Sequence, residues 1–169
     1  MAASVISTDL FDQVTGQARI ENDGQVVRNG SATTHAGVRC RGTYSSGQHL
    51  FRFKIEPLGN TKWMLFGIVN KSAPLSYDPY EQPTAYVWAG NDYVCTRGAL
   101  QDDCKCYTTD MQMNGSFQFL VDCERKIISL RNERTSSIHE LNVDVSKCAF
   151  PWQLYFNLYN EIDRARILR

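Results

Sequence analysis

Hydrophobic and polar residues alternate along most apolar stretches of this chain, with a period of two. In "HLFRFKIE", residues 49–56, one face carries Phe51, Phe53 and Ile55, while the other face is charged. This pattern is typical of a strand with one buried and one solvated face. No amphipathic pattern of helical period extends beyond about two turns, so the chain is predicted to be all-β.

Further segments show the same strand-like patterning and are separated by turn signals such as "NDG" and "NG". They are "KWMLFGIVN" (62–70), "GSFQFLVDC" (115–123), "KIISLRN" (126–132), "HELNVDV" (139–145) and "PWQLYFNLYN" (151–160). The first of them is apolar on both faces, as in a central strand that is covered on both sides. Many short strands at this spacing favour a sandwich or jelly roll over alternating strands and helices.

The charged stretch "DCERK", residues 122–126, lies between two of these strands. We interpret it as the turn of a hairpin, because polar residues in a connection stay in water. Cys123 is then the last inward-facing residue of its strand and is expected to be unreactive. A binding site is the alternative that the charges alone leave open.

Two longer irregular stretches interrupt the strands, at residues 70–88 and 89–115. Loops of such length in a compact domain usually carry function or are disordered. Tyrosine and tryptophan near loop tips supply rigid contact area at low entropic cost. The candidate partner-binding residues are therefore Tyr77, Asp78, Tyr80, Trp88, Tyr93 and Arg97. Buried packing is the competing interpretation for Trp88, and solvated surface is the competing one for Asp78 and Arg97.

Length and composition indicate one domain spanning residues 1–169, which is either complete or excised from a longer chain. Eighteen basic residues balance eighteen acidic residues without a run of five like charges. No long-range field is therefore expected to attract nucleic acid or an anionic membrane. The start of the sequence lacks a secretory pattern, and no apolar stretch is long enough to span a membrane. A cytoplasmic location is the simplest expectation.

No pattern in the chain points to a metal, a cofactor or a catalytic centre. The cysteines are Cys40, Cys95, Cys104, Cys106, Cys123 and Cys148, and none of them is in the paired spacing of a zinc ribbon. The dense group "CTRGALQDDCKC" would need a further ligand from elsewhere to hold a metal. No phosphate-binding or G-x-S-x-G motif occurs. A Cys40 nucleophile with His35 or His49 as its base lacks an oxyanion hole, so no enzymatic activity is expected.

Six segments of the chain together resemble the SPRY (B30.2) domain family. In order they are "GVRCRG", "GQHLFRFKIE", "WMLFGIV", "AYVWAGNDY", "FQFLVDCERKIISLRN" and "CAFPWQLYFNL". The residues that carry the resemblance are Gly47, His49, Phe53, Trp63, Gly67, Trp88, Tyr93, Asp122 and Trp152. The chain departs from the family pattern in "CERK", where a glycine usually follows the aspartate of the late hairpin, and in the cysteine-rich stretch 95–113.

The resemblance implies a bent sandwich of two antiparallel sheets, jelly-roll-like and similar in shape to concanavalin A. It also implies a non-catalytic module that binds a peptide or a folded protein with loops at one end of the sandwich. Family members are often the substrate-recognition part of a ubiquitin ligase or an adaptor. The implied contact positions lie in the loop after "FGIVN" and around residues 88–93.

Two other functions remain open at this point, because a fold does not specify its ligand. A lectin-like jelly roll could stack exposed aromatic rings on sugars. A structural domain could associate with copies of itself. The partner, the neighbouring domains and the oligomeric state do not follow from the sequence.

Overall fold

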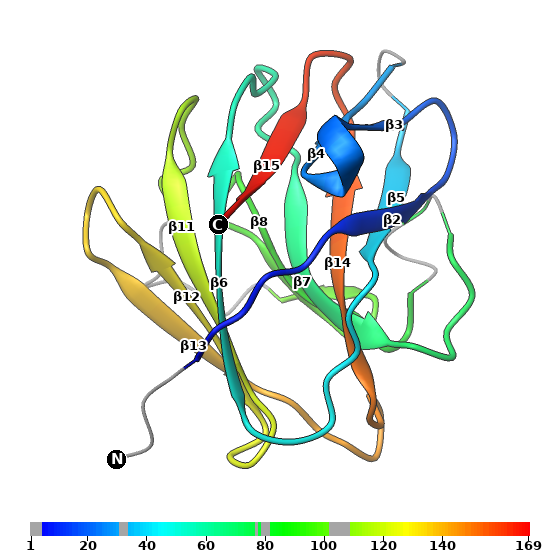
Figure 1. The fold of residues 1–169 in the computed structure, drawn as a ribbon, viewed down its shortest axis with the longest axis vertical. Coiled ribbons are helices and arrows are strands. Elements are labelled where there is room, and N and C mark those ends of the chain that lie inside the picture. Colours follow the sequence, from blue (N-terminus) through cyan, green and yellow to red (C-terminus); the bar gives the residue numbers. More distant parts are fainter. Residues whose placement is uncertain (1–4, 31–33, 77, 79–81, 102–108) are drawn as a thin grey trace.

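The protein is described here by a computed structural model, which covers residues 5–30, 34–76, 78, 82–101 and 109–169. Over these residues the regular structure consists of strands in two sheets and one short 3-10 helix, η1 (Asn22–Gly24). Figure 1 shows the strands of one sheet, called sheet A below, side by side from β13 to β3. Within the described ranges, no helix is long and apolar enough to cross a membrane.

Sheet A is the larger of the two sheets, and its antiparallel strands follow the order β13-β12-β11-β6-β15-β4-β3. Their bounds are β3 (Arg19–Glu21), β4 (Val26–Arg28), β6 (Gln48–Ile55), β11 (Ser116–Asp122), β12 (Ile127–Asn132), β13 (Ile138–Asn142) and β15 (Arg164–Leu168). The short strand β1 (Val5–Ile6) pairs in parallel with the first residues of β6. It lies on the same side of β6 as β15, which pairs with the later residues of that strand.

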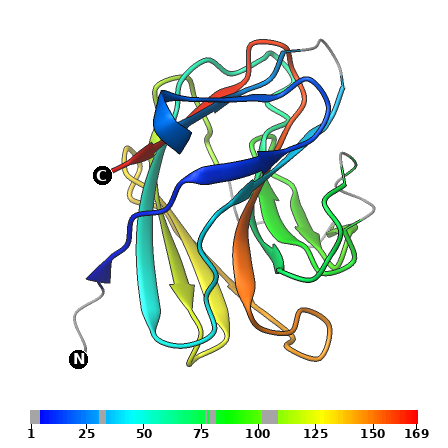
Figure 2. The ribbon, with the colours of Figure 1, turned by 45° about the vertical axis from the view of Figure 1, so that its right-hand side comes forward.

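Sheet B has the order β10-β9-β8-β7-β14-β5-β2, with antiparallel pairing throughout. Its strands are β2 (Phe11–Val14), β5 (Ala36–Cys40), β7 (Leu65–Asn70), β8 (Tyr86–Ala89), β9 (Val94–Thr96), β10 (Ala99–Gln101) and β14 (Trp152–Leu158). The turned view separates the two layers, with β6 in cyan on one side and β14 in orange on the other (Figure 2).

The core lies between the sheets and is dominated by phenylalanine rings. Phe53 of β6 is central, since its ring contacts those of Phe66, Phe117 and Phe156 at centroid distances of 4.8 to 5.5 Å. Edge-to-face and offset ring pairs of this kind add to the stabilisation that apolar burial supplies. The inward positions of β6 are the ones that its alternating sequence predicts.

The structure confirms the all-β sandwich and the strands inferred from the hydrophobic pattern. The segment 62–70 contains β7, which lies between β8 and β14 and whose first five residues are buried. Its outward side chains belong to a second apolar cluster on the far face of sheet B. This cluster explains why β7 is apolar on both faces.

The "DCERK" stretch is the turn between β11 and β12, as the sequence predicts. The buried Asp122 carboxylate accepts hydrogen bonds from Gln48 Nε2 at 2.7 Å and from the backbone nitrogen of Arg125 at 2.9 Å. Cys123 is buried, and desolvation, with nearby Asp122 and Glu124, raises the pKa of its thiol to about 11. The charges therefore close a hairpin, and the thiol stays protonated at neutral pH.

Lys126 in this turn adopts a φ of 56°, in the left-handed region that favours glycine. We predict that Lys126→Gly raises the free energy of unfolding by about 0.5 to 1 kcal/mol, because glycine relieves this conformational cost. Urea unfolding measures the change. Lys126→Ala is the matched control, since it removes the side chain but keeps Cβ; an equal gain in that variant would contradict the explanation.

Trp88 of β8 and His139 of β13 form a polar contact across the two sheets. Trp88 is fully buried, and its Nε1–H donates to His139 Nδ1 over 2.8 Å. Burial lowers the pKa of His139. Protonation of Nδ1 would replace the acceptor with a donor, so the contact requires the neutral imidazole.

This contact predicts a pH dependence of stability. Because the folded state binds a proton at His139 less readily than the unfolded state, the contribution of His139 is complete above its ordinary pKa of about 6.5 and is lost as the pH falls below it. Thermal melts between about pH 7.5 and 5.5 should show a falling Tm in the wild type. His139→Phe should flatten the part of the slope due to this residue. Identical slopes in the two proteins would contradict the prediction.

Candidate functional site

Four loops meet at one end of sheet B, which we call the cleft end. They are the segments 34–35 before β5, 56–64 before β7, 90–93 after β8 and 159–163 after β14. The register brings them together, because Leu65 at the start of β7 pairs with both Ala89 and Asn157. Asn157 in turn pairs with Gly37 near the start of β5.

A cleft of about 290 Å³ lies between these loops, lined by His35, Thr61, Trp63, Asn91 and Tyr159. His35 is oriented by Asn157, whose Oδ1 lies 2.7 Å from its Nδ1. The imidazole ring also contacts the Tyr159 ring at a centroid distance of 4.7 Å. One wall of the cleft is therefore aromatic and held in place by a polar contact.

The rim of the cleft carries a further aromatic pair. Tyr93 is 43% exposed, and its ring meets that of Trp63 edge-to-face at 6.0 Å. Trp63 is half-buried and packs against the apolar cluster on the far face of sheet B. Tyr93 thus presents a ring to solvent while Trp63 supports it from below.

Asn91 supplies an unsatisfied hydrogen-bond acceptor beside these rings. Its Oδ1 atom is buried and has no hydrogen-bond partner among the described residues. A buried polar atom without a partner costs about 1 to 3 kcal/mol and is uncommon in native proteins. The oxygen has almost no accessible surface, so a ligand donor could reach it only after a neighbouring side chain moved aside.

The buried carboxylate of Asp163 holds two of the cleft loops together. It accepts hydrogen bonds from the backbone nitrogens of Gly59 at 2.9 Å, Tyr159 at 3.0 Å and Asn160 at 2.8 Å. The close approach of the loops also requires glycine at position 59, since a Cβ there would lie 2.2 Å or less from side-chain atoms of Asn160. The position of Tyr159 in the cleft follows from these contacts.

We predict that Asp163→Asn lowers the free energy of unfolding by about 3 kcal/mol, because an amide nitrogen would then face backbone donors. Chemical denaturation measures the loss, and hydrogen exchange at Gly59 and Asn160 should become faster. Asp144→Asn is the control, since Asp144 is exposed and bonds locally to Ser146. Equal losses in the two variants would rule out an organising role for Asp163.

A loop that follows β7 crosses the far face of sheet B towards the cleft end. Arg39 is buried beneath it and donates to the carbonyls of Lys71 at 3.2 Å and Pro74 at 3.0 Å. A Cβ at Gly37 would lie 2.2 Å from the carbonyl oxygen of Ser76. The loop therefore passes directly over β5, and Ser76 reaches the level of Gly37, near the cleft.

The structure separates the residues that the sequence proposed for partner binding. Tyr77 and Tyr80 lie outside the described residues. Asp78 is half-buried, and its backbone nitrogen donates to Ser76 Oγ at 3.2 Å. Tyr93 lies at the cleft rim, whereas Arg97 is exposed at the opposite end of β8, where its backbone nitrogen bonds to the Ala85 carbonyl at 2.6 Å.

Trp88 was a candidate for partner contact, but its side chain is 0% exposed. It faces the core between the sheets, contacts the Phe119 ring at 5.9 Å and bonds to His139. The buried-packing interpretation describes it, and it presents no surface to a partner. Trp63, which the sequence analysis treated as a strand residue, lines the cleft together with Tyr159.

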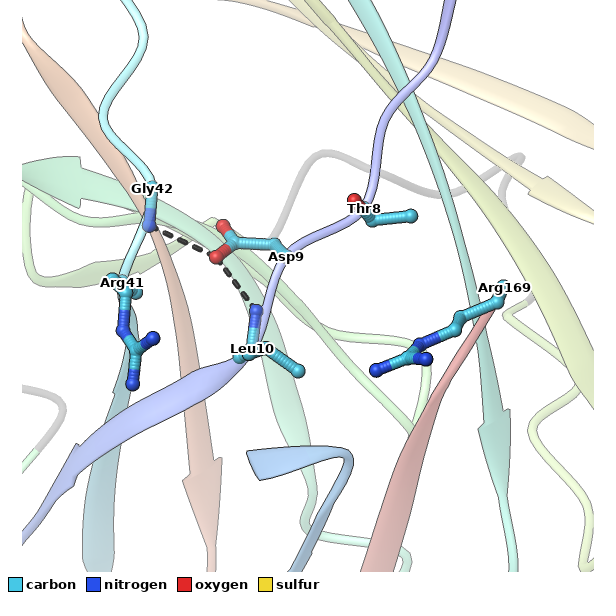
Figure 3. Close-up of a pocket in the computed structure, with 6 residues that line it drawn as sticks. All are labelled: Thr8, Asp9, Leu10, Arg41, Gly42 and Arg169. Atoms are coloured by element: carbon cyan, nitrogen blue, oxygen red, sulfur yellow. Dashed lines mark hydrogen bonds between the residues drawn. The ribbon is translucent and has the colours of Figure 1, made fainter. Parts of the chain in front are cut away.

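A second cleft, of about 400 Å³, is lined by Thr8, Asp9, Leu10, Arg41, Gly42 and Arg169. Figure 3 shows Asp9 bonded to the backbone nitrogens of Leu10 and Gly42. Its other carboxylate oxygen accepts the Tyr44 hydroxyl at 2.8 Å, and Arg41 pairs with Asp12. The Asp9 carboxylate is therefore fully engaged in joining the segment before β2 to Gly42 and Tyr44. The residues that line this cleft also include no aromatic side chain, unlike those of the first cleft.

The thiols of the described cysteines are not poised for catalysis. Cys40, Cys95, Cys123 and Cys148 are buried and free. Burial raises the pKa of Cys40 well above its usual range, that of Cys95 to about 11 and that of Cys148 to about 12. Cys104 and Cys106 lie outside the described residues. Over the described ranges, no group of three or more histidine, cysteine or acidic residues could hold a metal ion.

The cleft residues Thr61, Asn91 and Tyr159 escaped the sequence analysis. Each lies in a short connection beside an ordinary turn signal, "GNTK", "GND" or "NEID", and such signals mark a bend without indicating which bends meet. The useful signal in the sequence is that these bends all border segments rich in apolar and aromatic residues, at residues 62–70, 85–89 and 152–158. Central strands of one sheet bring their connections together at its two ends.

Comparison with solved structures identifies the fold. The SPRY domain of human HERC1 superposes with a TM-score of 0.75 at 13% identity, over 93% of this chain and 96% of that domain. The PSpry domain of TRIM65 superposes with a TM-score of 0.74 at 10% identity, over 97% of this chain and 90% of that one. No family model matches the sequence, and no curated protein does. The chain therefore has the SPRY fold, as its segment order predicted.

Proposed function

We propose that this domain is a non-catalytic protein-interaction module that binds a peptide or a folded partner through the loops at the cleft end. The observation that carries the proposal is the aromatic lining of the cleft by Trp63 and Tyr159, with the exposed ring of Tyr93 at its rim. Aromatic rings beside polar groups are typical of recognition surfaces. A backbone N–H or a side-chain donor of a polypeptide could reach the Asn91 oxygen once a side chain of the cleft moves aside.

The size of the cleft favours an anchoring side chain over a whole small molecule. Its volume of about 290 Å³ lies just below the range of about 300 to 1,000 Å³ that small-molecule pockets occupy. A partner chain could insert one residue between Trp63 and Tyr159 and extend over Tyr93 and the loop at Ser76. This mode needs no catalytic group.

The SPRY fold supports the proposal at the level of the family resemblance. A role in substrate recognition within a ubiquitin ligase or an adaptor, and a cytoplasmic location, are further parts of it and rest on that resemblance alone. A fold hosts many functions, so the partner has to be found by experiment.

Selection of a displayed peptide library against the immobilised domain tests the proposal. We expect the wild type to enrich a consensus motif, and we expect a variant with Tyr93→Ala and Asn91→Ala to bind the selected peptide at least about tenfold more weakly, because it loses the exposed ring and the acceptor. Titration of the labelled peptide by fluorescence anisotropy measures the two affinities.

Arg97→Ala is the matched control, because Arg97 is exposed at the opposite end of β8 and should leave the affinity unchanged. Thermal melts check that each variant is folded. An affinity that falls with Arg97→Ala and survives the Tyr93 and Asn91 changes would place the binding site at the other end. Enrichment of no motif, together with binding in a glycan array, would favour the lectin-like alternative.

A further inference from the structure

The outer face of sheet A carries more basic than acidic side chains, although the whole chain has no net charge. The residues on this face alternate with those that enter the core. Over the described strands and the residues that adjoin them, seven basic side chains lie on this face against five carboxylates, of which Asp122 is buried. They are Arg19, Arg28, Arg52, Lys54, Arg131, Arg164 and Arg166, and Glu21, Glu56, Asp122, Glu133 and Glu140.

Several of these cations are directly opposite one another on neighbouring strands. Arg28 of β4 pairs in register with Arg19 and with Arg164. Lys54 of β6 is opposite Arg166 of β15. Cross-strand partners have Cβ atoms about 4.5 to 5.5 Å apart, and like charges at that distance destabilise a sheet. Glu21 and Glu56 bridge Arg28, Arg164 and Arg166 and offset much of this repulsion, so it is least relieved at Arg19 and Lys54.

The carboxylates on this face neutralise only some of the cations. Glu21 pairs with Arg28 and Arg164, Glu56 pairs with Arg164 and Arg166, and Glu133 forms two hydrogen bonds with Arg52. Lys54, Arg19 and Arg131 form no ion pair within 4 Å in the described part of the chain. Arg131 nevertheless helps to lower the pKa of Glu133, so Lys54 and Arg19 are the least neutralised of the three.

An apolar strip borders the cations on the same face. Leu50 of β6 is opposite Leu120 of β11, and Ile6 of β1 is beside Leu50 and 63% exposed. Along β6, outward positions therefore run from Leu50 through Arg52 to Lys54. Alternate residues of a strand are about 6.6 to 6.8 Å apart, which is also the spacing of alternate side chains in an extended peptide.

We propose that this face is a second docking surface, whose occupant is an extended acidic peptide segment of a partner protein. An apolar residue of the segment packs near Leu50, a carboxylate beyond it meets Lys54, and a further carboxylate competes with Glu133 for Arg52 and Arg131. Arginine and carboxylate groups form charge-assisted hydrogen bonds that suit this arrangement. The residues of this surface differ from those that line the cleft.

The composition of the face favours a peptide over nucleic acid. No aromatic side chain is among the outward residues of its described strands, so bases find no stacking platform. Glu21, Glu56 and Glu133 interrupt the cations and would repel a continuous phosphate backbone or an anionic lipid surface. A peptide can place its carboxylates between these positions.

Fluorescence anisotropy with a labelled synthetic peptide, in which leucine and serine precede alternating glutamate and serine, tests the proposal. We expect wild-type binding that weakens as salt is added, and no binding of the analogue with glutamine in place of glutamate. Lys54→Glu with Arg131→Glu should weaken binding at least about tenfold. The milder pair Lys54→Gln with Arg131→Gln should weaken binding less. This graded loss would show that the charge reversal does not act by unfolding the domain.

Lys71→Glu with Lys147→Glu is the matched control, since it changes the net charge equally at exposed positions away from this face. It should leave the affinity almost unchanged, and so should Tyr93→Ala at the cleft, which separates this proposal from the proposed function. Equal losses in the two charge-reversal pairs would overturn the proposal. Tighter binding of a single-stranded oligonucleotide or of phosphatidylserine vesicles than of the peptide would overturn it as well.

Discussion

The alternation of side chains along β6 is the constraint on which both faces of sheet A depend. Phe53 enters the core and contacts rings from β7, β11 and β14, so its orientation is fixed by packing on all sides. Its neighbours Arg52 and Lys54 are then obliged to face outwards, because a shift of one residue would bury both charges. The position of the cationic face is therefore a consequence of how the core packs.

At the other sheet, a buried carboxylate has the comparable role. Asp163 satisfies backbone donors of the loops that contain Gly59 and Tyr159, and these loops form two sides of the cleft. A recognition surface built from loops needs such support, since loops gain little stability from apolar burial of their own. Arg39 acts in the same way on the far face of sheet B, where its guanidinium holds the backbone of a loop that reaches towards the cleft.

The sequence predicted the sandwich because its long strands have recognisable hydrophobic patterns. Residues 49–56, 115–123 and 151–160 alternate, and residues 62–70 are apolar on both faces. The short strands β1, β3, β9 and β10 have two or three residues each, too few to show a period, and the analysis missed them. Trp88 shows the limit for the site: an aromatic residue next to a loop can lie in the core or at the rim, and only the register of β8 decides.

The balanced charge of the chain predicts a weak electrostatic field at long range. It does not predict the local charge of any one surface. Equal numbers of cations and anions exclude strong long-range steering, but they do not say where each charge lies. Arg28 and Arg164 are more than a hundred positions apart in sequence and adjacent in the sheet. Such an arrangement becomes visible only when strand order is known.

The bond between Trp88 and His139 has a mechanical consequence. Trp88 belongs to sheet B, whereas His139 lies on β13, the last strand of sheet A, so the bond joins the two layers at the border of the sandwich. A force that peels β13 away from β12 would be transmitted to β8 through this contact and not only through the strand pairing of sheet A. The bond therefore resists the detachment of β13 from the edge of sheet A.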